Sequence, residues 1–549
     1  MSENLMFIYQ FTNVLTIISW ILFAVVYALR IIHYTHMFQL NSYKPKVQLK
    51  WLFNNKGAFI KNSLPLMLLA VWSLITPGLV IEKSELINGV EVGFLLRPVF
   101  LIQAVYVVGL IIALVLNLPK KAKKPLVYTN RVKRLLITCA LVLIILCCAI
   151  VLLVDDMNGA QPLLPMLVLI LAPFILLLCN LINKPIELSI NKYYINDAKR
   201  MLKEHTSLTV IGVTGSYGKT SVKYILGTLL EAKFNVLITP ESFNTPLGVT
   251  KTIRSSLRAT HDIFVCEMGA KNVGDIKEIC EIVYPQHGII TSVGPQHLES
   301  FKSLENVKKT KFELADALPA YGKLFLNGED ENIKSHSHPH GAITYGLNPS
   351  CDYYADEITV TSAGTSFVVK HGDEAVPFTV ALIGAHNVIN LVGAIAICCE
   401  MGIDLKKLPP YARKIKAVEH RLQLTKRGKT TVVDDAYNSN PSGAKAALDA
   451  ISLFQGKKII VTPGMIELGS VQYEENRKFG MNIAKVCDFA VLVGQKQAEP
   501  IKQGLLDAGF PEDCIYVADE LTDGANKAFS LFPDEEKVVL FENDLPDNY

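Results

Sequence analysis

Residues 208–220, LTVIGVTGSYGKT, hold glycines, a lysine and a hydroxyl at a spacing that suits phosphate chemistry. A β-branched apolar run precedes the glycines and helical spacing follows Thr220, so a strand, a tight turn and a helix are predicted. The N–H groups of such a turn converge on phosphate oxygens at the positive end of the helix. Lys219 can reach the terminal phosphates, and the Thr220 hydroxyl suits Mg²⁺. The predicted ligand is a nucleoside triphosphate. The turn residues expected to hold it are Gly215, Ser216 and Gly218.

Two residues with metal-binding side chains end the apolar runs that follow. Glu267 closes the run IFVCE, and His297 follows GIITSVGPQ. A lone carboxylate in a buried strand is costly unless a cation compensates it. Because open α/β sheets bind ligands at the carboxyl edge of their strands, both side chains are expected at one edge. We predict that they share one Mg²⁺. A helix-capping carboxylate and a packed histidine are the alternative.

About 180 mostly apolar residues precede the phosphate loop, whereas the rest of the 549-residue chain has an ordinary globular composition. Five stretches approach the roughly 20 residues that a helix needs to cross a bilayer core. They are residues 9–29, 62–81, 96–118, 135–154 and 162–182. An α-helical membrane bundle of about five transmembrane helices is therefore predicted, with a re-entrant hairpin of two neighbouring stretches as the alternative.

Loop charges predict the orientation of this bundle, because Lys and Arg gather on the cytoplasmic side. The loop that begins at Arg30 and the loop after the third stretch are basic, with Lys44, Lys46, Lys50, Lys56, Lys120, Lys121, Lys123, Lys124, Arg131, Lys133 and Arg134. The alternate loops are acidic, with Glu82, Glu85, Glu91, Asp155 and Asp156. The predicted location is the cytoplasmic (inner) membrane, with the N-terminus outside and the phosphate loop on the cytoplasmic side. Membrane lipid is the expected partner of the basic loops, and a soluble acidic substrate is the alternative.

The cysteines and histidines predict neither disulfides nor a zinc site. The eleven cysteines form no C-x-x-C pair, and several lie in apolar stretches, so reduced, packed thiols are expected. His336, His338 and His340 form the tract SHSHPH, for which a solvated loop is favoured over a metal site. The first apolar stretch lacks the basic start and small-residue exit of a cleaved signal peptide, so it is expected to be retained. No nucleic-acid partner is expected.

Eight further motifs follow the phosphate loop. They are ESFNTPLGVTKTIR (241–254), FVCEMGA (264–270), GPQHLESF (294–301), VKKTKFELA (307–315), GAHNVINLVGA (384–394), EHRLQ (419–423), VVDDAYNSNPSG (432–443) and GMIELG (464–469). In order and approximate spacing they resemble the Mur ligase family, ATP-dependent amide ligases of cell-wall synthesis. The resemblance covers about residues 206–485. The nearest branch is similar to MurF, which adds D-alanyl-D-alanine to UDP-N-acetylmuramoyl-tripeptide.

The chemistry of amide formation suits the same residues. A carboxylate is a poor electrophile, so ATP must first convert it to an acyl phosphate that an amine can attack. Transfer of the highly charged phosphoryl group depends on positioning and on cationic stabilisation. Lys219 and Mg²⁺ fit that need.

The resemblance implies roles for individual residues. Lys311 matches the lysine that is carbamylated in the family, whose carbamate helps to hold a second Mg²⁺. The implied metal ligands are Thr220, Glu267, His297 and Lys311. The implied nucleotide contacts are Asn387 at the adenine, Arg421 from the last domain, Asp435 near the ribose and phosphates, and Tyr437. The implied contacts of the muramoyl-peptide are Asn244 and Thr245. The implied catalytic residues are Lys219, Glu267, His297, Lys311 and Arg421.

The resemblance also implies the domain order. A membrane region (1–183) and a linker (184–205) are followed by a central doubly wound α/β domain (206–410). A second Rossmann-like α/β domain (411–549) ends the chain, with ATP in the cleft between the two. Closure of that cleft would exclude water from an acyl phosphate, which otherwise hydrolyses.

Three features depart from the MurF pattern. Membrane stretches replace the domain that helps to hold the UDP-sugar, the chain ends in VVLFENDLPDNY instead of a K-G-S-R-type strand and turn, and Asn476 stands where a histidine is expected. The predicted function is a membrane-anchored, ATP-dependent amide ligase of envelope synthesis. It joins a carboxylate-bearing cell-wall precursor to an amino-acid or dipeptide amine. The alternatives are ligation onto a lipid-linked or polymeric, poly-γ-glutamate-like substrate, and a nucleotide-sensing transporter or scaffold.

Overall fold

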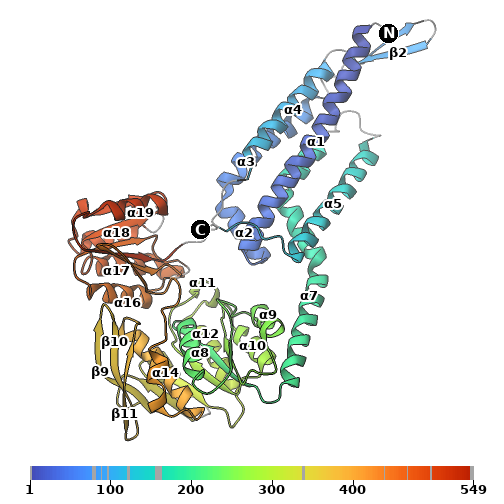
Figure 1. Ribbon diagram of the computed structural model, residues 1–549. Coiled ribbons are helices and arrows are strands. Elements are labelled where there is room, and N and C mark those ends of the chain that lie inside the picture. The colour runs from blue at the N-terminus through green and yellow to red at the C-terminus, as the bar shows by residue number, and fades with distance from the viewer. Residues whose placement is uncertain are drawn as a thin grey trace. The chain divides into compact units, whose positions relative to one another are not determined.

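The computed structural model describes residues 3–76, 82–87, 90–95, 98–119, 124–154, 163–336, 341–437, 439–466, 468–494 and 498–544 (Figure 1). Some residues named in the sequence analysis lie outside these ranges, namely Lys120, Lys121, Lys123, Asp155, Asp156, His338 and His340. The chain divides between Ile190 and Asn191 into two compact units. We call them the helical unit and the catalytic unit and describe each by itself.

The helical unit consists of long apolar helices and one hairpin. Its helices are α1 (Glu3–Leu40), α2 (Pro45–Asn54), α3 (Lys56–Ile75), α4 (Pro98–Leu116), α5 (Asn130–Val154), α6 (Leu163–Ile170) and the first part of α7 (Ala172–Glu204). Strands β1 (Glu82–Ile87) and β2 (Val90–Leu95) pair antiparallel. Helix α1 packs against α4, and α3 packs against α4 and α6.

Four helical segments of the described chain are long and apolar enough to cross a membrane. They are Asn13–Leu40, Lys56–Ile75, Asn130–Ile150 and Ala172–Glu204. The predicted third span corresponds to α4, whose apolar part, Leu101–Leu116, is shorter than the other four. Bulky apolar side chains also cover the outside of these helices, among them Leu68, Leu74, Ile145 and Leu181. An exposed apolar surface of this kind marks contact with an apolar environment.

Two segments predicted to lie between spans are helical. Residues 30–40 continue α1, so Arg30, which the sequence places at the start of a basic loop, is fully buried inside the helical unit. The predicted linker, residues 184–205, lies almost wholly in α7, which begins in the last apolar stretch. Lys and Arg are good helix formers, so basic residues do not by themselves end a helix.

The first domain of the catalytic unit is built on a nine-stranded sheet with the order β11-β10-β9-β8-β7-β6-β3-β5-β4. Its strands are β3 (Thr209–Thr214), β4 (Val236–Ile238), β5 (Ile263–Glu267), β6 (His287–Ile290), β7 (Leu324–Asn327), β8 (Ala342–Gly346), β9 (Tyr353–Thr361), β10 (Gly364–His371) and β11 (Glu374–Val380). Strands β3 to β9 pair parallel, and β10 and β11 extend the sheet as an antiparallel meander. The central strand β3 is buried on both faces, which is why its sequence is an unbroken apolar run.

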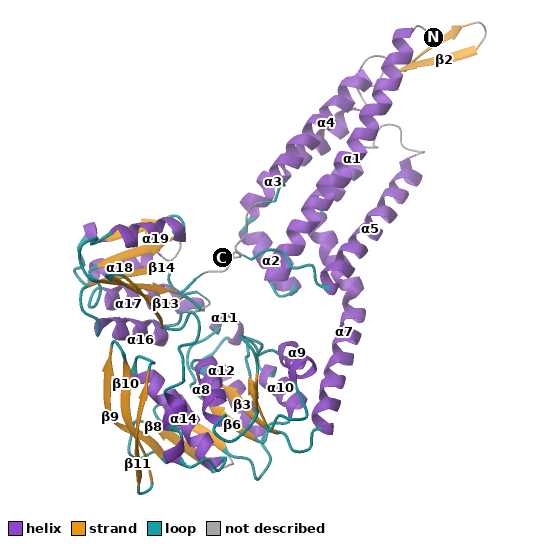
Figure 2. Ribbon diagram, in the orientation of Figure 1, coloured by secondary structure: helices purple, strands orange, loops and turns teal. Residues whose placement is uncertain are grey.

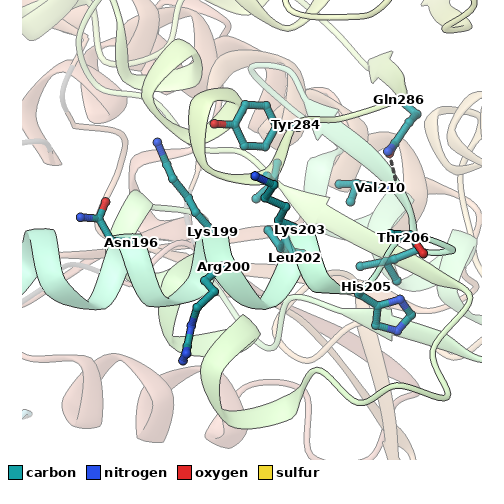
Figure 3. A pocket seen from close by; sticks show the side chains of 12 residues that line it. Asn196, Lys199, Arg200, Leu202, Lys203, His205, Thr206, Val210, Tyr284 and Gln286 are labelled. Carbon is teal, nitrogen blue, oxygen red and sulfur yellow. Dashed lines mark hydrogen bonds between the residues drawn. The ribbon is translucent and has the colours of Figure 1, made fainter.

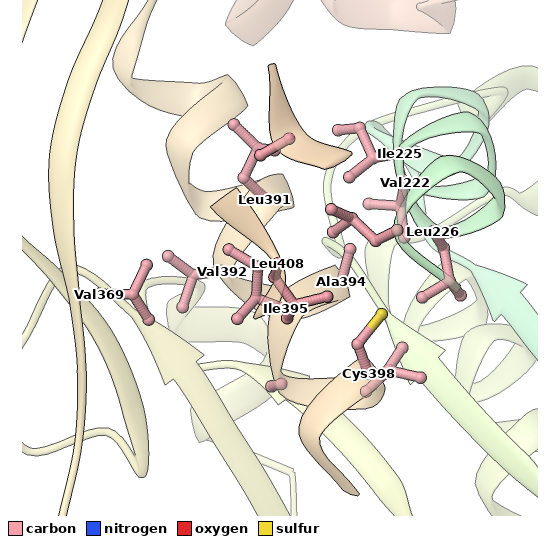
Figure 4. Packing of buried hydrophobic residues seen from close by; sticks show 14 of the residues in the cluster. Val222, Ile225, Leu226, Val369, Leu391, Val392, Ala394, Ile395, Cys398 and Leu408 are labelled. Atoms are coloured by element: carbon pink, nitrogen blue, oxygen red, sulfur yellow. The ribbon is translucent and has the colours of Figure 1, made fainter. Parts of the chain in front are cut away.

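Helices cover both faces of this sheet (Figure 2). Helices α8 (Lys219–Leu230) and α14 (Ala385–Glu400) share one hydrophobic core, and α9 (Pro246–Ser256), α10 (Asp275–Val283) and α12 (Leu304–Asp316) share the other. Figure 4 shows Val222 and Leu226 of α8 beside Leu391 and Ala394 of α14. The short helices are α11 (Leu298–Phe301), α13 (Glu331–Lys334) and α15 (Pro409–Ala412).

The second domain of the catalytic unit has a six-stranded sheet with the order β12-β13-β17-β14-β15-β16. The strands are β12 (Gln423–Arg427), β13 (Thr430–Asp435), β14 (Lys457–Thr462), β15 (Phe489–Val493), β16 (Ile515–Ala518) and β17 (Lys537–Glu542). All pairings are parallel except the β12–β13 hairpin. The helices are α16 (Pro441–Ser452), α17 (Gln472–Ile483), α18 (Ala498–Asp507) and α19 (Leu521–Ser530). The predicted pair of α/β domains is confirmed.

Leu314 of α12 fastens that helix to two neighbouring strands. A Cβ added at Gly212 of β3 would lie 2.6 Å from Leu314 Cδ1, and one at Gly288 of β6 would lie 2.9 Å from its Cγ. The two glycines therefore make room for one fully buried leucine. The same helix begins with Leu304, which is 37% exposed.

Truncating Leu314 should weaken the fold of the catalytic unit. We expect Leu314→Ala to lower the free energy of unfolding by about 2–5 kcal/mol, because it removes a buried isobutyl group between two glycines that cannot fill the gap. Leu304→Ala is the matched control on the same helix, with an expected change within about 0.5 kcal/mol. Urea unfolding followed by far-UV circular dichroism measures both. Equal midpoint shifts for the two variants would contradict this assignment.

Candidate active site

The phosphate loop joins β3 to α8 through two glycines with positive φ. Gly215 has φ 151°, and Gly218, which caps α8, has φ 80°. A Cβ at Gly215 would lie 2.0 Å from Thr291 Oγ1, and one at Gly218 would lie 2.7 Å from Asn390 Oδ1. Both positions therefore require glycine for space as well as for conformation.

The segment after β6 holds this loop in place. Ser216 N–H donates to Ser292 O at 2.8 Å, and the Ser216 hydroxyl donates to Gly294 O at 3.0 Å. Tyr217 N–H donates to Ser292 Oγ at 2.7 Å. The loop is thus pre-formed by backbone and hydroxyl groups, although the N–H of Ser216 is already engaged. The predicted contact between Ser216 and a nucleotide phosphate stays a prediction.

Lys219 lies over its own loop. Its ammonium donates to Gly215 O at 2.6 Å and to Ser216 O at 3.2 Å. Burial lowers the pKa of Lys219 to about 8, against the opposing effect of the Glu267 charge. A cation that is bonded only to backbone carbonyls here is available to pair with a phosphate.

Glu267, at the carboxyl end of β5, is the centre of a buried polar network. Its Oε1 accepts from Thr220 Oγ1 at 3.2 Å and from Asn244 Nδ2 at 2.9 Å. Its Oε2 lies 3.0 Å from Lys223 Nζ, an ion pair without the alignment of a hydrogen bond. Burial alone raises the pKa of Glu267, but the charges of Lys223 and Lys219 outweigh it and hold that pKa below its usual value. Glu267 is therefore ionised at neutral pH.

Lys223 is the site residue that sequence reasoning missed. Its side chain is fully buried, and its ammonium also donates to Glu241 O at 2.5 Å. The signal was the spacing, since residues four apart on a helix share a face and Lys219 is already at the phosphate loop. The sequence predicts a metal ion as the partner of Glu267, whereas in the structure the Lys223 ammonium lies beside it.

The predicted metal ligands are only partly brought together. Thr220 and Glu267 touch, as described above. His297 lies after β6, has a left-handed φ of 51° and is the N-cap residue of α11. In the described chain, no group of three or more His, Cys, Asp or Glu side chains is close enough to hold a metal ion. The Thr220–Glu267 pair nevertheless fits Mg²⁺, which binds through one or two protein oxygens, nucleotide phosphates and water.

Lys311 of α12 is 1% exposed. Burial lowers its pKa well below the usual value, and the nearby charge of Lys219 lowers it further. Asp275 and Glu313 oppose this effect through their charges, but neither forms an ion pair with it in the described chain. Burial therefore favours the neutral amine of Lys311 over its charged form.

The predicted nucleotide contacts of the second domain lie near one another. Arg421 stacks over the Tyr437 ring with Cζ 4.6 Å from its centroid. Asp435 Oδ1 accepts from Leu422 N–H at 3.2 Å, and the Tyr437 hydroxyl forms a hydrogen bond with that of Ser242. Asn387, in the first turn of α14, donates to Ile383 O at 2.9 Å.

The predicted substrate loop has structural contacts of its own. Asn244 is bonded to Glu267, and the Thr245 hydroxyl caps α9 by accepting from Gly248 N–H at 3.3 Å. Asn476 is fully buried and exchanges hydrogen bonds of 2.8 and 2.9 Å with the backbone of Met465. It fastens the loop after β14, so this departure from the family pattern has a structural role.

A carboxyl pair lies at the end of the last strand, where the family has its K-G-S-R-type turn. The β13–β17 register sets Asp435 opposite Glu542. Glu542 is buried, its Oε1 accepts from Ser439 Oγ at 2.6 Å, and its Oε2 meets no donor. Burial and the Asp435 charge raise the pKa of Glu542 well above its usual value. A proton held between the two carboxyls supplies the missing donor.

This proton makes stability depend on pH. A carboxyl whose pKa is raised by folding stabilises the fold at low pH, and that contribution is lost as the pH rises through the folded-state pKa. Glu542→Gln keeps a neutral side chain at every pH. We expect the variant to equal the native protein at pH 4, below the unfolded-state pKa of a glutamate, and to have the higher midpoint of thermal unfolding at pH 8. Circular dichroism melts at the two pH values measure this, and parallel pH profiles would exclude the shared proton.

Figure 3 shows a pocket of the catalytic unit with a different lining. It has a volume of about 680 Å³ and is lined by the end of α7 and by residues next to β3 and α10. Its cations include Lys199, Lys203 and Arg200, the last of which pairs with Asp197 at 2.7 Å. None of its lining residues belongs to the phosphate loop or to the Glu267 network.

Two family patterns match the catalytic unit. The Mur ligase middle domain matches residues 213–398, and the "Mur ligase, glutamate ligase domain" matches residues 420–542. The chain belongs to the Mur ligase family through these two domains.

Particular relatives refine this assignment. The UDP-N-acetylmuramoyl-tripeptide–D-alanyl-D-alanine ligase of Bacillus subtilis is 30% identical over 290 residues, which is 52% of this chain and 62% of that protein. The ligase of the same name from Mycobacterium tuberculosis is 33% identical over 256 residues, 45% of this chain and 49% of that one. The crystal structure of the MurF ligase of Thermotoga maritima in complex with ADP superposes with a TM-score of 0.58 and 25% identity, over 64% of this chain and 80% of that one. This chain therefore spans about half to two thirds of the length of these curated relatives.

Proposed function

We propose that the protein is a membrane-anchored, ATP- and Mg²⁺-dependent amide ligase of cell-envelope synthesis, with a MurF-like reaction. The observation that carries the proposal is the pre-formed phosphate loop beside the Glu267 network. Lys219, Thr220 and Glu267 stand together at the carboxyl edge of a parallel sheet, where such folds bind nucleotides. The names of the relatives support the same reaction class.

The proposed reaction has two steps. An oxygen of the substrate carboxylate attacks the γ-phosphorus of ATP, the bond to the bridging oxygen breaks, and ADP leaves. The amine then attacks the acyl carbon, phosphate leaves, and the amine loses its extra proton to water or buffer. Lys219 neutralises charge on the transferred group, and Lys223 keeps Glu267 ionised and oriented. Bound Mg²⁺, held by Thr220 and Glu267 with nucleotide oxygens, supplies further charge neutralisation.

His297 and Arg421 complete the proposed catalytic set. His297, in the segment after β6, is assigned to Mg²⁺ together with Glu267. Arg421 adds positive charge toward Lys219 and Lys223, as its lowering of both pKa values indicates. Asn387, Asp435 and Tyr437 are assigned to the nucleotide.

Removal of the Lys219 ammonium tests the ligase assignment. Detergent-purified full-length protein is incubated with ATP, Mg²⁺ and UDP-N-acetylmuramoyl-tripeptide, with and without D-alanyl-D-alanine. Phosphate release and the mass of the product are measured together. Lys219→Ala should lower the rate by about 10²–10³-fold, because it removes one preorganised charge from the transferred group. The control is Lys309→Ala, an exposed lysine of α12 that should leave the rate unchanged.

A second substrate class is favoured by the helical unit. The described part of the chain has four helices that are long and apolar enough to cross a membrane. A lipid-linked or polymeric acceptor is therefore the alternative to the soluble UDP-linked substrate. Turnover on a membrane-lipid extract but not on the UDP-linked tripeptide would select it. If the Lys219→Ala variant still supported normal growth and cell-wall integrity in cells, the transporter or scaffold alternative would be favoured instead.

Lys311 is proposed to carry a carbamate. Its neutral buried amine adds to CO₂, a C–N bond forms, and one proton is released, which converts the side chain to an anion suited to a second Mg²⁺. Protein equilibrated with ¹³C-bicarbonate should give a carbamate carbon signal by NMR. Lys311→Met should abolish that signal, and removal of CO₂ should lower activity reversibly. A signal that persists in Lys311→Met would place the carbamate elsewhere.

A further inference from the structure

The helical unit buries one cation without a counter-charge. Arg30 of α1 is 0% exposed. Its Nη1 donates to Asn62 O at 3.4 Å and to Asn117 Oδ1 at 3.2 Å. Its Nη2 donates to the Tyr34 hydroxyl at 3.4 Å and to Ser63 Oγ at 2.9 Å. In the part of the chain that the structure describes, all four of these acceptors are neutral.

These contacts leave the guanidinium incompletely satisfied. Nε of Arg30 is buried and has no hydrogen-bond partner. Three of the four hydrogen bonds are 3.2 Å or longer, beyond the usual optimum for an N–H donor. A buried cation of this kind is costly in an apolar environment and marks a functional site by default.

A second arginine of the same unit provides an internal comparison. Arg134 of α5 pairs with Glu187 of α7 through two hydrogen bonds of 2.7 and 2.9 Å. The unit thus neutralises this arginine with its own carboxylate in bidentate geometry. Arg30 has the same chemistry but no carboxylate partner among the described residues. Its counter-charge must come from outside these side chains.

The position of Arg30 along the helices identifies the kind of counter-charge. Asn62 and Ser63 lie directly before the apolar part of α3, and Asn117 follows the last residue of α4. The basic residues Lys56 and Lys61 precede them in α3. The guanidinium therefore lies where apolar helix meets basic segments, which is the depth of lipid phosphates at a membrane surface.

Half-buried side chains lie beside the guanidinium. They are Asn62, Asn117 and Phe59, whose ring centroid lies 6.0 Å from Arg30 Cζ. The Ser63 and Tyr34 hydroxyls can each turn a donor toward an anion. The Asn117 amide carries further donors, which are bonded to Asn62 O at 3.3 Å and to Ala113 O at 2.8 Å.

We propose that Arg30, with Tyr34, Ser63 and Asn117, binds the phosphate head group of a membrane lipid. The planar guanidinium offers two parallel N–H donors that match phosphate oxygens, with Nε as the donor now unused. The inference rests on the membrane anchoring in the proposed function, but not on its chemistry. The lipid is either a bulk anionic phospholipid or a polyprenyl phosphate, the form in which a lipid-linked envelope precursor is carried.

Lipid binding to the full-length protein in neutral detergent tests this site by native mass spectrometry. The probes are a polyprenyl phosphate, the same polyprenol without phosphate, and phosphatidylglycerol. The phosphate-bearing lipids should bind and the polyprenol should not. Preference for the polyprenyl phosphate would assign a carrier lipid, and equal binding of phosphatidylglycerol would assign bulk lipid. Equal binding of polyprenol and polyprenyl phosphate would overturn the proposal.

Variants locate the binding. Arg30→Gln should weaken phosphate-lipid binding by about tenfold or more, because it removes a charge-assisted hydrogen-bond pair. Lys184→Gln removes an exposed cation of the same unit and should change binding by less than about twofold. Arg30→Lys keeps the positive charge but cannot form two parallel hydrogen bonds. Its affinity for phosphate-bearing lipid should lie between the affinities of the other two variants. Native-like binding by Arg30→Gln would exclude the site.

Folding of the variants is measured separately from lipid binding. The three tryptophans of the chain, Trp20, Trp51 and Trp72, all lie in the helical unit, so their emission reports whether Arg30→Gln has folded. If that variant unfolds, Ser63→Ala replaces it, since it removes the shortest partner and keeps the charge, and loss of binding is again expected. Lipid binding is measured without ATP. A negative ligase assay would therefore not affect the conclusion about the lipid site. Recovery of the protein without detergent in the soluble fraction would refute the anchoring instead.

Discussion

The catalytic unit depends on one buried carboxylate. Glu267 ends β5 inside the sheet edge, where an uncompensated negative charge is unfavourable, and Lys223, Thr220 and Asn244 all turn toward it. These partners come from the phosphate-loop helix and from the loop before α9. The charge therefore ties the loop that faces phosphate to the loop expected to face the second substrate. Both loops therefore contact the same side chain.

The helical unit has the opposite distribution of side chains. Its surface is apolar and its interior holds polar groups, including the Arg134–Glu187 pair and the isolated Arg30. Water cannot relieve a buried charge in a bilayer, so each such residue needs a partner from the protein or from lipid. Under the proposed function, the same helices would serve both for anchoring and for recognition of a lipid.

The sequence predicted the features that local chemistry determines. Strand β3, its glycines and the helix that follows are visible because each residue type is required in place, and the two α/β domains follow from ordered motifs. Lys223, Glu542 and Arg30 were missed because their environments depend on distant segments. Lys223 meets Glu267 across the sheet, and Glu542 meets Asp435 only through the β13–β17 register. Arg30 follows the apolar stretch 9–29 and therefore looks like a loop residue in the sequence, whereas α1 continues to Leu40.

The contact of Leu314 with Gly212 and Gly288 has an evolutionary consequence. A larger residue at either glycine is compatible only with a smaller one at position 314, so the three positions cannot vary independently. They lie in different motifs, on β3, β6 and α12. Drift in one segment is thus restrained by the other two, and homologous chains should change at these sites together or not at all.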